Sequence, residues 1–270
     1  FNQSVNFDTS KVTNMSDMFC NATVFNQPLN NFNTSKVTNM SFMFYDTKAF
    51  NQPLNFNTSK VTNMSYMFSG ATAFNQSVNF DTSNVTDMSY MFQWAQVFNQ
   101  PVNFNTSNVT NMSTMFRGAR AFNQSINFDT SKVTNMSAMF QGAQVFNQPV
   151  NFNTSKVTNM SDMFYGAQVF NQDLSSLDFA AAQKIDHFVS HSKLSIKNYD
   201  KLLKKWHIQF KDKTIAHKPQ STGLKYCAAE AEHDYLKNTK NWTFNDSKQC
   251  PPAFTTRWTN LPAGKFEIKL

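Results

Sequence analysis

Long apolar runs and catalytic signatures are both missing from this sequence of 270 residues. No stretch approaches the ~18 consecutive apolar residues that a membrane-spanning helix needs, so we expect no membrane span. The sequence also contains no nucleophile elbow, no phosphate-binding loop and no pair of acidic residues in a variable pocket. These absences exclude the common signatures of enzymes, and they predict a protein without catalytic residues and without a cofactor.

Charged residues are scarce and unevenly placed. Residues 1–179 contain eight basic residues, nine aspartates and no glutamate, whereas residues 180–270 contain 16 basic and eight acidic residues. The net charge of +7 therefore comes from the C-terminal third of the chain. A lysine-rich surface in contact with water is one interpretation. The other is a patch that binds an acidic polysaccharide, an anionic cell wall or nucleic acid.

A block of about 24 residues recurs through the first two-thirds of the chain, and one copy is a residue longer because of Asn30-Asn31. Each copy reads roughly F-N-Q-x-V-N-F-D-T-S-K-V-T-N-M-S-x-M-F-x-x-A. Such a period indicates stacked units, each of which buries its apolar face against a neighbour. We therefore expect a solenoid of about 7.5 repeats over residues 1–179. The copies open at Phe1, Phe25, Phe50, Phe74, Phe98, Phe122, Phe146 and Phe170.

Two periodicities within each copy predict one short strand and one short helix. Apolar residues alternate with a polar asparagine around positions five to seven, as in a strand. The next apolar residues are spaced by three, four and three positions, which places them on one helical face; in the first copy they are Val12, Met15, Phe19 and Ala22. The fold class that follows is an α/β solenoid, a leucine-rich-repeat-like right-handed coil that curves with its strands on the concave side.

The region that follows the repeats is expected to be a small α+β cap over residues 180–252. An amphipathic pattern predicts a helix that covers the last open coil; its apolar residues are Ile196, Tyr199, Leu202, Leu203 and Trp206. Residues 253–270 are expected to begin a further β-rich module or to form a terminal strand. Because the chain begins within the repeat pattern, we expect it to be a fragment of a longer protein.

The sequence has only three cysteines. Cys227 and Cys250 bracket a segment that contains a second expected helix, residues 228–237, and an expected strand, residues 242–244. A disulfide between these two cysteines would stabilise the small cap and would place the protein outside the cytoplasm. Cys20, in the first copy, is then left without a partner.

The repeat unit resembles that of the BspA-type leucine-rich-repeat surface proteins of bacteria, which share a unit of about 25 residues ending in M-S-x-M-F. The resemblance covers residues 1–179 and continues through residues 194–200, 226–227 and 234–239. This chain departs from the pattern in its 24-residue spacing and at residues 179–182, where Phe-Ala-Ala-Ala replaces V-T-x-M. The resemblance implies a secreted or surface-anchored protein that adheres to other cells or to host matrix.

Two sets of exposed residues are candidate ligand-binding surfaces. Aromatic residues at variable positions should cluster on the helix side of copies two to four, either as a partner surface or by ordinary lateral packing; they are Phe42, Tyr45, Tyr66, Tyr90 and Trp94. A column of asparagines should lie on the strand face. These amides either bond to one another along the array or form a flat surface for glycans and protein backbone; they include Asn55, Asn79 and Asn103.

Three further patterns carry less weight. His187 and His191 have the spacing of a helical metal site, but no Cys or Glu is near them in the sequence as a third ligand, so we expect no metal site. An ice-binding surface on the threonine column that includes Thr9, Thr34 and Thr58 would need a flat array. The Asn-x-Ser/Thr triplets are so dense that glycans on them would prevent stacking, which favours a bacterial source.

Together these patterns predict a non-enzymatic adhesion protein that is exposed on the bacterial cell surface. Its expected partner is a protein of a host or neighbouring cell, or a surface glycan, and no nucleic-acid partner is expected. The alternative is a structural subunit that self-associates into an extracellular filament or layer, because an uncapped stack can accept another copy.

Overall fold

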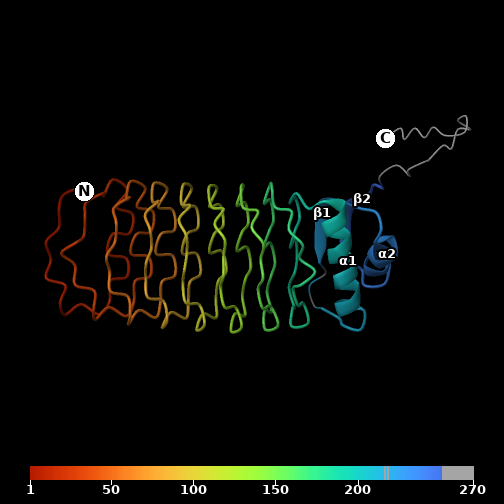
Figure 1. The fold of residues 1–270 in the computed structure, drawn as a ribbon, viewed down its shortest axis with the longest axis horizontal. Coiled ribbons are helices and arrows are strands. Elements are labelled where there is room, and N and C mark those ends of the chain that lie inside the picture. Colours follow the sequence, from red (N-terminus) through yellow and green to blue (C-terminus); the bar gives the residue numbers. More distant parts are fainter. Residues whose placement is uncertain (216, 218, 251–270) are drawn as a thin grey trace, which may run out of the picture.

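The structure, a computed structural model, describes residues 1–215, 217 and 219–250. Residues up to about 192 form a row of coils, and the regular elements follow as α1 (Ile196–Phe210), β1 (Gln220–Tyr226), α2 (Glu230–Asn238) and β2 (Thr243–Lys248) (Figure 1). The expected module of residues 253–270 lies outside the described residues. Among those that are described, no helix is both long and apolar enough to cross a membrane.

Backbone hydrogen bonds join each coil to the next, which makes the chain a repeat protein whose copies lie side by side. Parallel bridges link equivalent residues, from Asn14 with Asn39 through to Asn159 with Lys184. Beyond each bridge, alternate N–H groups donate to the following coil; the Phe68 N–H, for example, donates to the Met91 carbonyl (2.9 Å). Neighbouring copies therefore depend on each other for their backbone hydrogen bonds.

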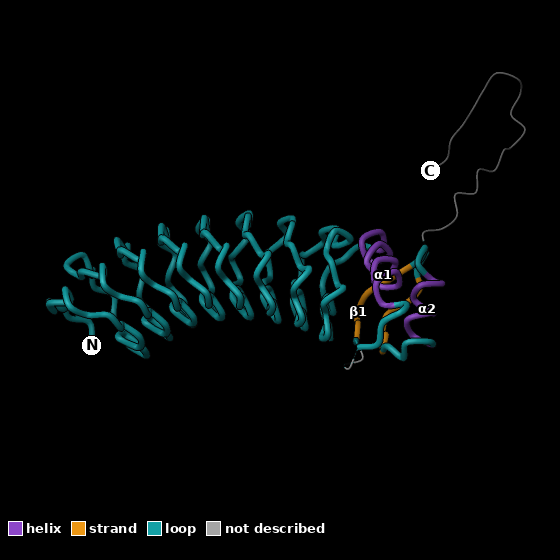
Figure 2. Tube along the Cα trace, turned by 90° about the horizontal axis from the view of Figure 1, so that it is seen from below, coloured by secondary structure: helices purple, strands orange, loops and turns teal. Residues whose placement is uncertain are grey.

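The short helix that we predicted in each copy is wrong. The described part of the repeats contains no helix, and Figure 2 shows this region as turns and loops. Two positions of each copy have a left-handed backbone; in the third copy they are Tyr66 (φ 58°) and Gly70 (φ 73°). Two left-handed residues four positions apart interrupt the right-handed i to i−4 ladder of a helix, so consecutive turns form instead.

The strand that we predicted at positions five to seven is wrong as well. In the described repeats the pairing between coils is at position 14, where Asn63 bridges Asn39 on one side and Asp87 on the other. The expected concave face, which was to consist of strands at positions five to seven, is therefore wrong too. The alternation of apolar and polar residues correctly predicted which side chains are buried, but not where the backbone pairs.

The methionine and phenylalanine side chains fill a continuous interior, as the sequence predicts. Phe68 is fully buried, and its ring stacks on Phe74 of the next copy at 4.1 Å between centroids. The equivalent rings of the two flanking coils, Phe44 and Phe92, lie 5.5 and 5.6 Å away. Each coil thus shields the rings of its neighbours, and a single coil could not bury them.

Polar side chains form two further ladders between coils. In the Asn-Gln pair of each copy, the asparagine oxygen accepts hydrogen bonds from the next coil; Asn75 Oδ1 accepts from the Asn99 N–H (3.0 Å) and from Gln100 Nε2 (3.2 Å). Buried threonines donate to the next coil, as Thr58 Oγ1 does to the Asp81 carbonyl (2.9 Å). The threonine column that we considered for ice binding is therefore not available, because Thr9, Thr34 and Thr58 are at most 3% exposed.

The C-terminal elements continue the pattern of the repeats. The N–H of Ser195 and the side chain of Asn198 both donate to Asn171 Oδ1, as an Asn-Gln pair does in every copy. On the opposite side of the coil, the His187 and His191 N–H groups donate to carbonyls of β1. α1 and β1 together therefore close the end of the stack. The proposed boundary at residue 179 stays a prediction, since bonds of the repeat type continue beyond it.

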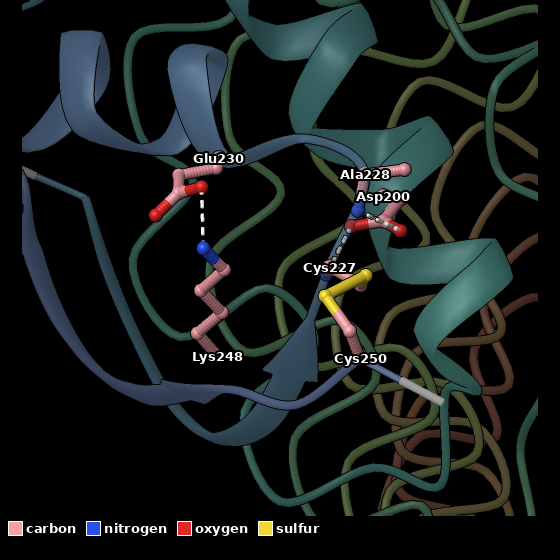
Figure 3. Close-up of a disulfide and its surroundings, with 6 residues drawn as sticks. All are labelled: Asp200, Cys227, Ala228, Glu230, Lys248 and Cys250. Atoms are coloured by element: carbon pink, nitrogen blue, oxygen red, sulfur yellow. Dashed lines mark hydrogen bonds and ion pairs between the residues drawn. A yellow bond between two sulfur atoms is a disulfide. The ribbon is translucent and has the colours of Figure 1, made fainter. Parts of the chain in front are cut away.

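The predicted disulfide between Cys227 and Cys250 is confirmed (Figure 3). Both oxygens of Asp200, on α1, accept backbone N–H bonds at 2.9 Å, one from Cys227 and one from Ala228. The disulfide therefore joins the end of β2 to the start of the α2 segment, which is itself held on α1. The second helix expected at residues 228–237 and the strand expected at residues 242–244 are present as α2 and β2, whereas β1 was not predicted. β1 and β2 pair in parallel.

Candidate functional site

Four of the five predicted aromatic residues form one column on the array. The ring centroids of Phe42 and Tyr66 are 4.3 Å apart, and those of Tyr66 and Tyr90 are 4.1 Å apart, with the rings nearly parallel. Tyr45 lies against this column, 5.7 Å from Phe42. The three stacked residues occupy the first left-handed position of their copies, so stacking of the coils brings their rings together.

The rings of this aromatic column stack face to face on one another. Burial, together with a hydrogen bond to Tyr90, raises the pKa of Tyr66 to about 12. The phenol therefore stays neutral at physiological pH, and the column presents ring edges and hydroxyl groups to solvent. A sugar that stacks on an aromatic face has little access to the central ring, so the column has the geometry of lateral packing.

The fifth aromatic residue, Trp94, lies apart from the column. It occupies the second left-handed position (φ 56°), is 42% exposed, and has the Arg117 guanidinium 5.7 Å from its ring centroid. Its indole covers Gly118 of the next coil so closely that a Cβ atom there would lie 2.2 Å from the ring. The structure thus places Trp94 beside Arg117 and Gly118, in a contact that the sequence reading missed.

The predicted asparagine column is exposed on the other face of the repeat. Asn55, Asn79 and Asn103 are all exposed, and none of their amides takes part in a hydrogen bond among the described residues. Asn55 and Asn79 also border a shallow hollow of about 480 Å³, whose other lining residues are Pro53, Leu54, Phe56, Gln76 and Ser77. The ladder of amide hydrogen bonds lies at the Asn-Gln pairs instead, so the amides of these three asparagines keep their donors and acceptors.

The cap contains a buried polar cluster that the sequence analysis did not predict. His233 is 3% exposed, and its two ring nitrogens lie 3.1 Å from Asp234 Oδ1 and 3.0 Å from Asp246 Oδ1. Burial lowers the pKa of His233, but the hydrogen bonds with Asp246 and Asp234 outweigh this effect, and the pKa ends above its ordinary value. The Tyr199 hydroxyl donates to the second oxygen of Asp246 (2.7 Å). The cluster links α1, α2 and β2.

The two histidines of the last coil form hydrogen bonds within the protein. His187 Nδ1 lies 3.3 Å from Ser190 Oγ, and His191 Nε2 lies 3.0 Å from Thr222 Oγ1. No group of three or more His, Cys, Asp or Glu side chains with metal-binding geometry occurs in the part of the chain that the structure describes. These contacts account for both histidines as packing residues at the junction with β1.

Comparison with known proteins gives a family but no characterised relative. A family model described as "Mycoplasma protein of unknown function, DUF285" matches residues 1–78, 54–127 and 102–206. No curated protein and no solved structure matches the chain. The three matches overlap and together span the repeats and most of α1. The chain therefore belongs to the DUF285 family.

Proposed function

We propose that this chain is a non-enzymatic binding module of a bacterial surface protein, and that its array is a leucine-rich-repeat-like solenoid of the BspA type. The repeat residues support the resemblance, and the backbone bonds between residues about 24 positions apart support the continuous coil. The ligand is a glycan or a protein segment of another cell. A long, regular surface is what stacked repeats provide, and such surfaces commonly bind extended partners.

The asparagine column is the observation that supports this proposal. The amides of Asn55, Asn79 and Asn103 offer donors and acceptors at the spacing of the coils, and no hydrogen bond among the described residues uses them. The aromatic column is the weaker candidate, because its central ring is stacked on both faces. A polymer with hydroxyl, amide or peptide groups lying along the array would meet Asn55, Asn79 and Asn103 in succession.

The disulfide supports a location outside the cytoplasm. Cys227 and Cys250 are bonded in the cap, and such bonds persist mainly in oxidising surroundings. The cap closes the stack by means of α1 and β1, and the disulfide fixes the last described residue to this closure. An adhesion module at the cell surface would need such resistance to local unfolding.

The test is a glycan and matrix-protein array that is probed with the fluorescently labelled chain and two matched variants. The first variant is Asn55→Ala, Asn79→Ala and Asn103→Ala. The second is Gln96→Ala, Gln144→Ala and Gln168→Ala, which removes three amides without side-chain hydrogen bonds from another column. We expect the first variant to lose the ligands that the parent chain binds, and the second to retain them.

Other outcomes of the array would contradict the proposal. If the asparagine variant keeps every ligand and Tyr66→Ala loses them, the aromatic column is the binding surface. If the parent chain binds nothing, and light scattering shows large assemblies, the self-associating filament becomes the better description. Thermal unfolding of each variant checks that the fold is intact.

A further inference from the structure

Helix α1 lies along the segment of the last coil that carries the surface columns. Its start bonds to Asn171, as described above, and near its end Gln209 donates to Asp178 Oδ1 (2.7 Å) and accepts from the Phe179 N–H (2.9 Å). α1 therefore runs beside residues 171–179. In the other copies, this segment holds the asparagine column and, two positions before it, a column of Ser or Pro residues such as Pro53 and Ser77, which we call the Ser/Pro column. Figure 1 shows α1 standing against the final coil.

Four lysines follow the outer side of α1 and form what we call the lysine stripe. Lys201 is three or four residues from each of the other three, which places all four on one side of the helix; they are Lys197, Lys201, Lys204 and Lys205. The first three are exposed and the fourth is half-buried. Among the described residues, Lys201 alone of these four forms an ion pair, with Asp173 at 2.5 Å.

The contact with Asp173 fixes where the stripe lies on the molecule. Asp173 occupies the position that is Ser or Pro in the other copies, two positions before the asparagine column. The hydrogen bond from Lys201, with another from Ser175, lowers the pKa of Asp173 to about 2, so this carboxylate is charged at all physiological pH values. The asparagine column therefore leads, at its C-terminal end, to the lysine stripe, of which Lys197, Lys204 and Lys205 form no ion pair within the described part of the chain.

The charge of this surface changes along its length. The exposed residues of the Ser/Pro and asparagine columns are neutral from Pro53 to Asn151. The nearest carboxylates, Asp81 and Asp129, are two positions further along their coils and accept hydrogen bonds from the following serines. A ligand on the columns thus meets neutral amides first and then several positive charges on α1.

We propose that the ligand of the asparagine column is an anionic polysaccharide, bearing sulfate or carboxylate groups, and that the lysine stripe binds these groups. This inference rests on the proposed function and specifies its ligand class. The asparagine amides form hydrogen bonds with the hydroxyl groups of the polymer along the array, and the ammonium groups of α1 attract its negative charges. Uncharged polymers of the same backbone lack the second interaction and bind more weakly.

The first measurement compares dextran with dextran sulfate, which share a backbone and differ in charge. Both are labelled with a fluorophore and titrated with the chain, while anisotropy is followed at 50 mM and 300 mM salt. We expect dextran sulfate to bind at least tenfold more tightly than dextran at low salt, and to lose most of this advantage at high salt as the charges are screened. Equal binding of the two polymers would overturn the proposal.

The second measurement separates the stripe from the overall positive charge. The variant Lys197→Gln and Lys204→Gln removes two charges from the stripe. The control, Lys225→Gln and Lys237→Gln, removes two exposed charges from β1 and α2. We expect the Kd for dextran sulfate to rise about tenfold in the stripe variant and less than twofold in the control. An equal rise in both would indicate a general charge effect and would overturn the proposal.

The third measurement tests whether the columns and the stripe bind one polymer. Asn79→Asp and Asn103→Asp add two negative charges with almost no change of shape, and Gln96→Glu and Gln168→Glu add the same charge on another column. We expect only the first pair to weaken the binding of dextran sulfate. A ligand found on the array that needs the asparagines but is insensitive to the lysine variant would leave the proposed function intact and refute the anionic class. Tighter binding of single-stranded DNA than of any anionic glycan would also refute it.

Discussion

The repeat array and the cap are stabilised by different means. In the array, near-identical coils exchange backbone, Asn-Gln and threonine hydrogen bonds, and a column of rings such as Phe68, Phe92 and Phe116 runs through them. In the cap, two helices and two strands surround a small core, which is fastened by a disulfide and by buried polar contacts. The same set of contacts recurs in every coil of the array, whereas each contact in the cap occurs once.

This difference determines how each part responds to the loss of a core side chain or a cross-link. A repeat array loses the contacts between one coil and its two neighbours when a core residue is truncated, and its other coils are unchanged. A small domain has too little apolar interior to tolerate the loss of a cross-link. Variants in the two parts should therefore differ in how far their effects extend as well as in their size.

The largest effect is expected from an interior ring. Phe92 is fully buried and lies 4.1 Å from Phe98 and 5.7 Å from Phe116. Phe92→Ala should lower the free energy of unfolding of the array by about 3–5 kcal/mol, because it leaves a cavity between coils. Urea denaturation followed by circular dichroism measures the loss. Val97→Ala is the control, since that side chain is 45% exposed, and a comparable loss there would contradict a core made of stacked rings.

Removal of the disulfide should affect the cap alone. Cys227→Ser with Cys250→Ser frees a loop with a sequence separation of 23 residues, and the cap should lose about 3 kcal/mol. Hydrogen exchange read by mass spectrometry should show faster exchange in α2 and β2 and unchanged exchange in the coils before residue 150. Faster exchange in the distant coils would mean that the array and the cap unfold as one unit, which would remove the contrast between them.

Two glycines in equivalent positions separate backbone strain from side-chain packing. Gly118 (φ 66°) and Gly142 (φ 65°) share a left-handed conformation, so alanine costs about 1–2 kcal/mol at either site. A Cβ atom at Gly142 has no neighbour within 4 Å, whereas one at Gly118 meets the indole of Trp94. Gly118→Ala should therefore lower the melting temperature more than Gly142→Ala does. Trp94→Ala in the Gly118→Ala background should reduce the difference, and no such rescue would contradict the packing of Trp94 on the glycine.

The sequence predicted the burial pattern of the repeats better than their backbone. A spacing of three, four and three residues correctly predicted the burial of Met64, Phe68 and Ala71, since one side of a coil must face the core. The same spacing also fits consecutive turns. Residue types such as those of Tyr66 and Tyr90 do not indicate a positive φ. The glycines four positions later in several copies did indicate a left-handed residue at their own position. A helix was therefore the wrong choice between two structures with the same buried residues.

The cap was predicted in part because its signals are local. The amphipathic pattern of α1 and the cysteine spacing both predict structure within a short segment, and both were confirmed. β1 was missed because its role depends on pairing with the last coil, whose residues 187 and 191 donate backbone hydrogen bonds to carbonyls of β1. The cluster of His233, Asp246 and Tyr199 was missed for the same reason, since its members come from three elements. Of the candidate site, the exposure of the asparagines was predictable, but the contact of Lys201 on α1 with Asp173 of the last coil was not.

The smallest effect is the dependence of cap stability on pH. His233 has a pKa above its ordinary value in the folded cap because Asp246 and Asp234 favour the charged imidazole. Its contribution to stability is therefore fully present below the unfolded pKa of about 6.5, and it is lost as the pH rises through the folded pKa. Cap unfolding, followed by the fluorescence of Trp206 and Trp242, should require less urea at pH 9 than at pH 6, and His233→Gln should abolish this difference. The interior coils, which bury no histidine or carboxylate among the described residues, should show no such slope between these pH values. An equal slope in both parts, or one that survives in His233→Gln, would show that the imidazole is not the group responsible.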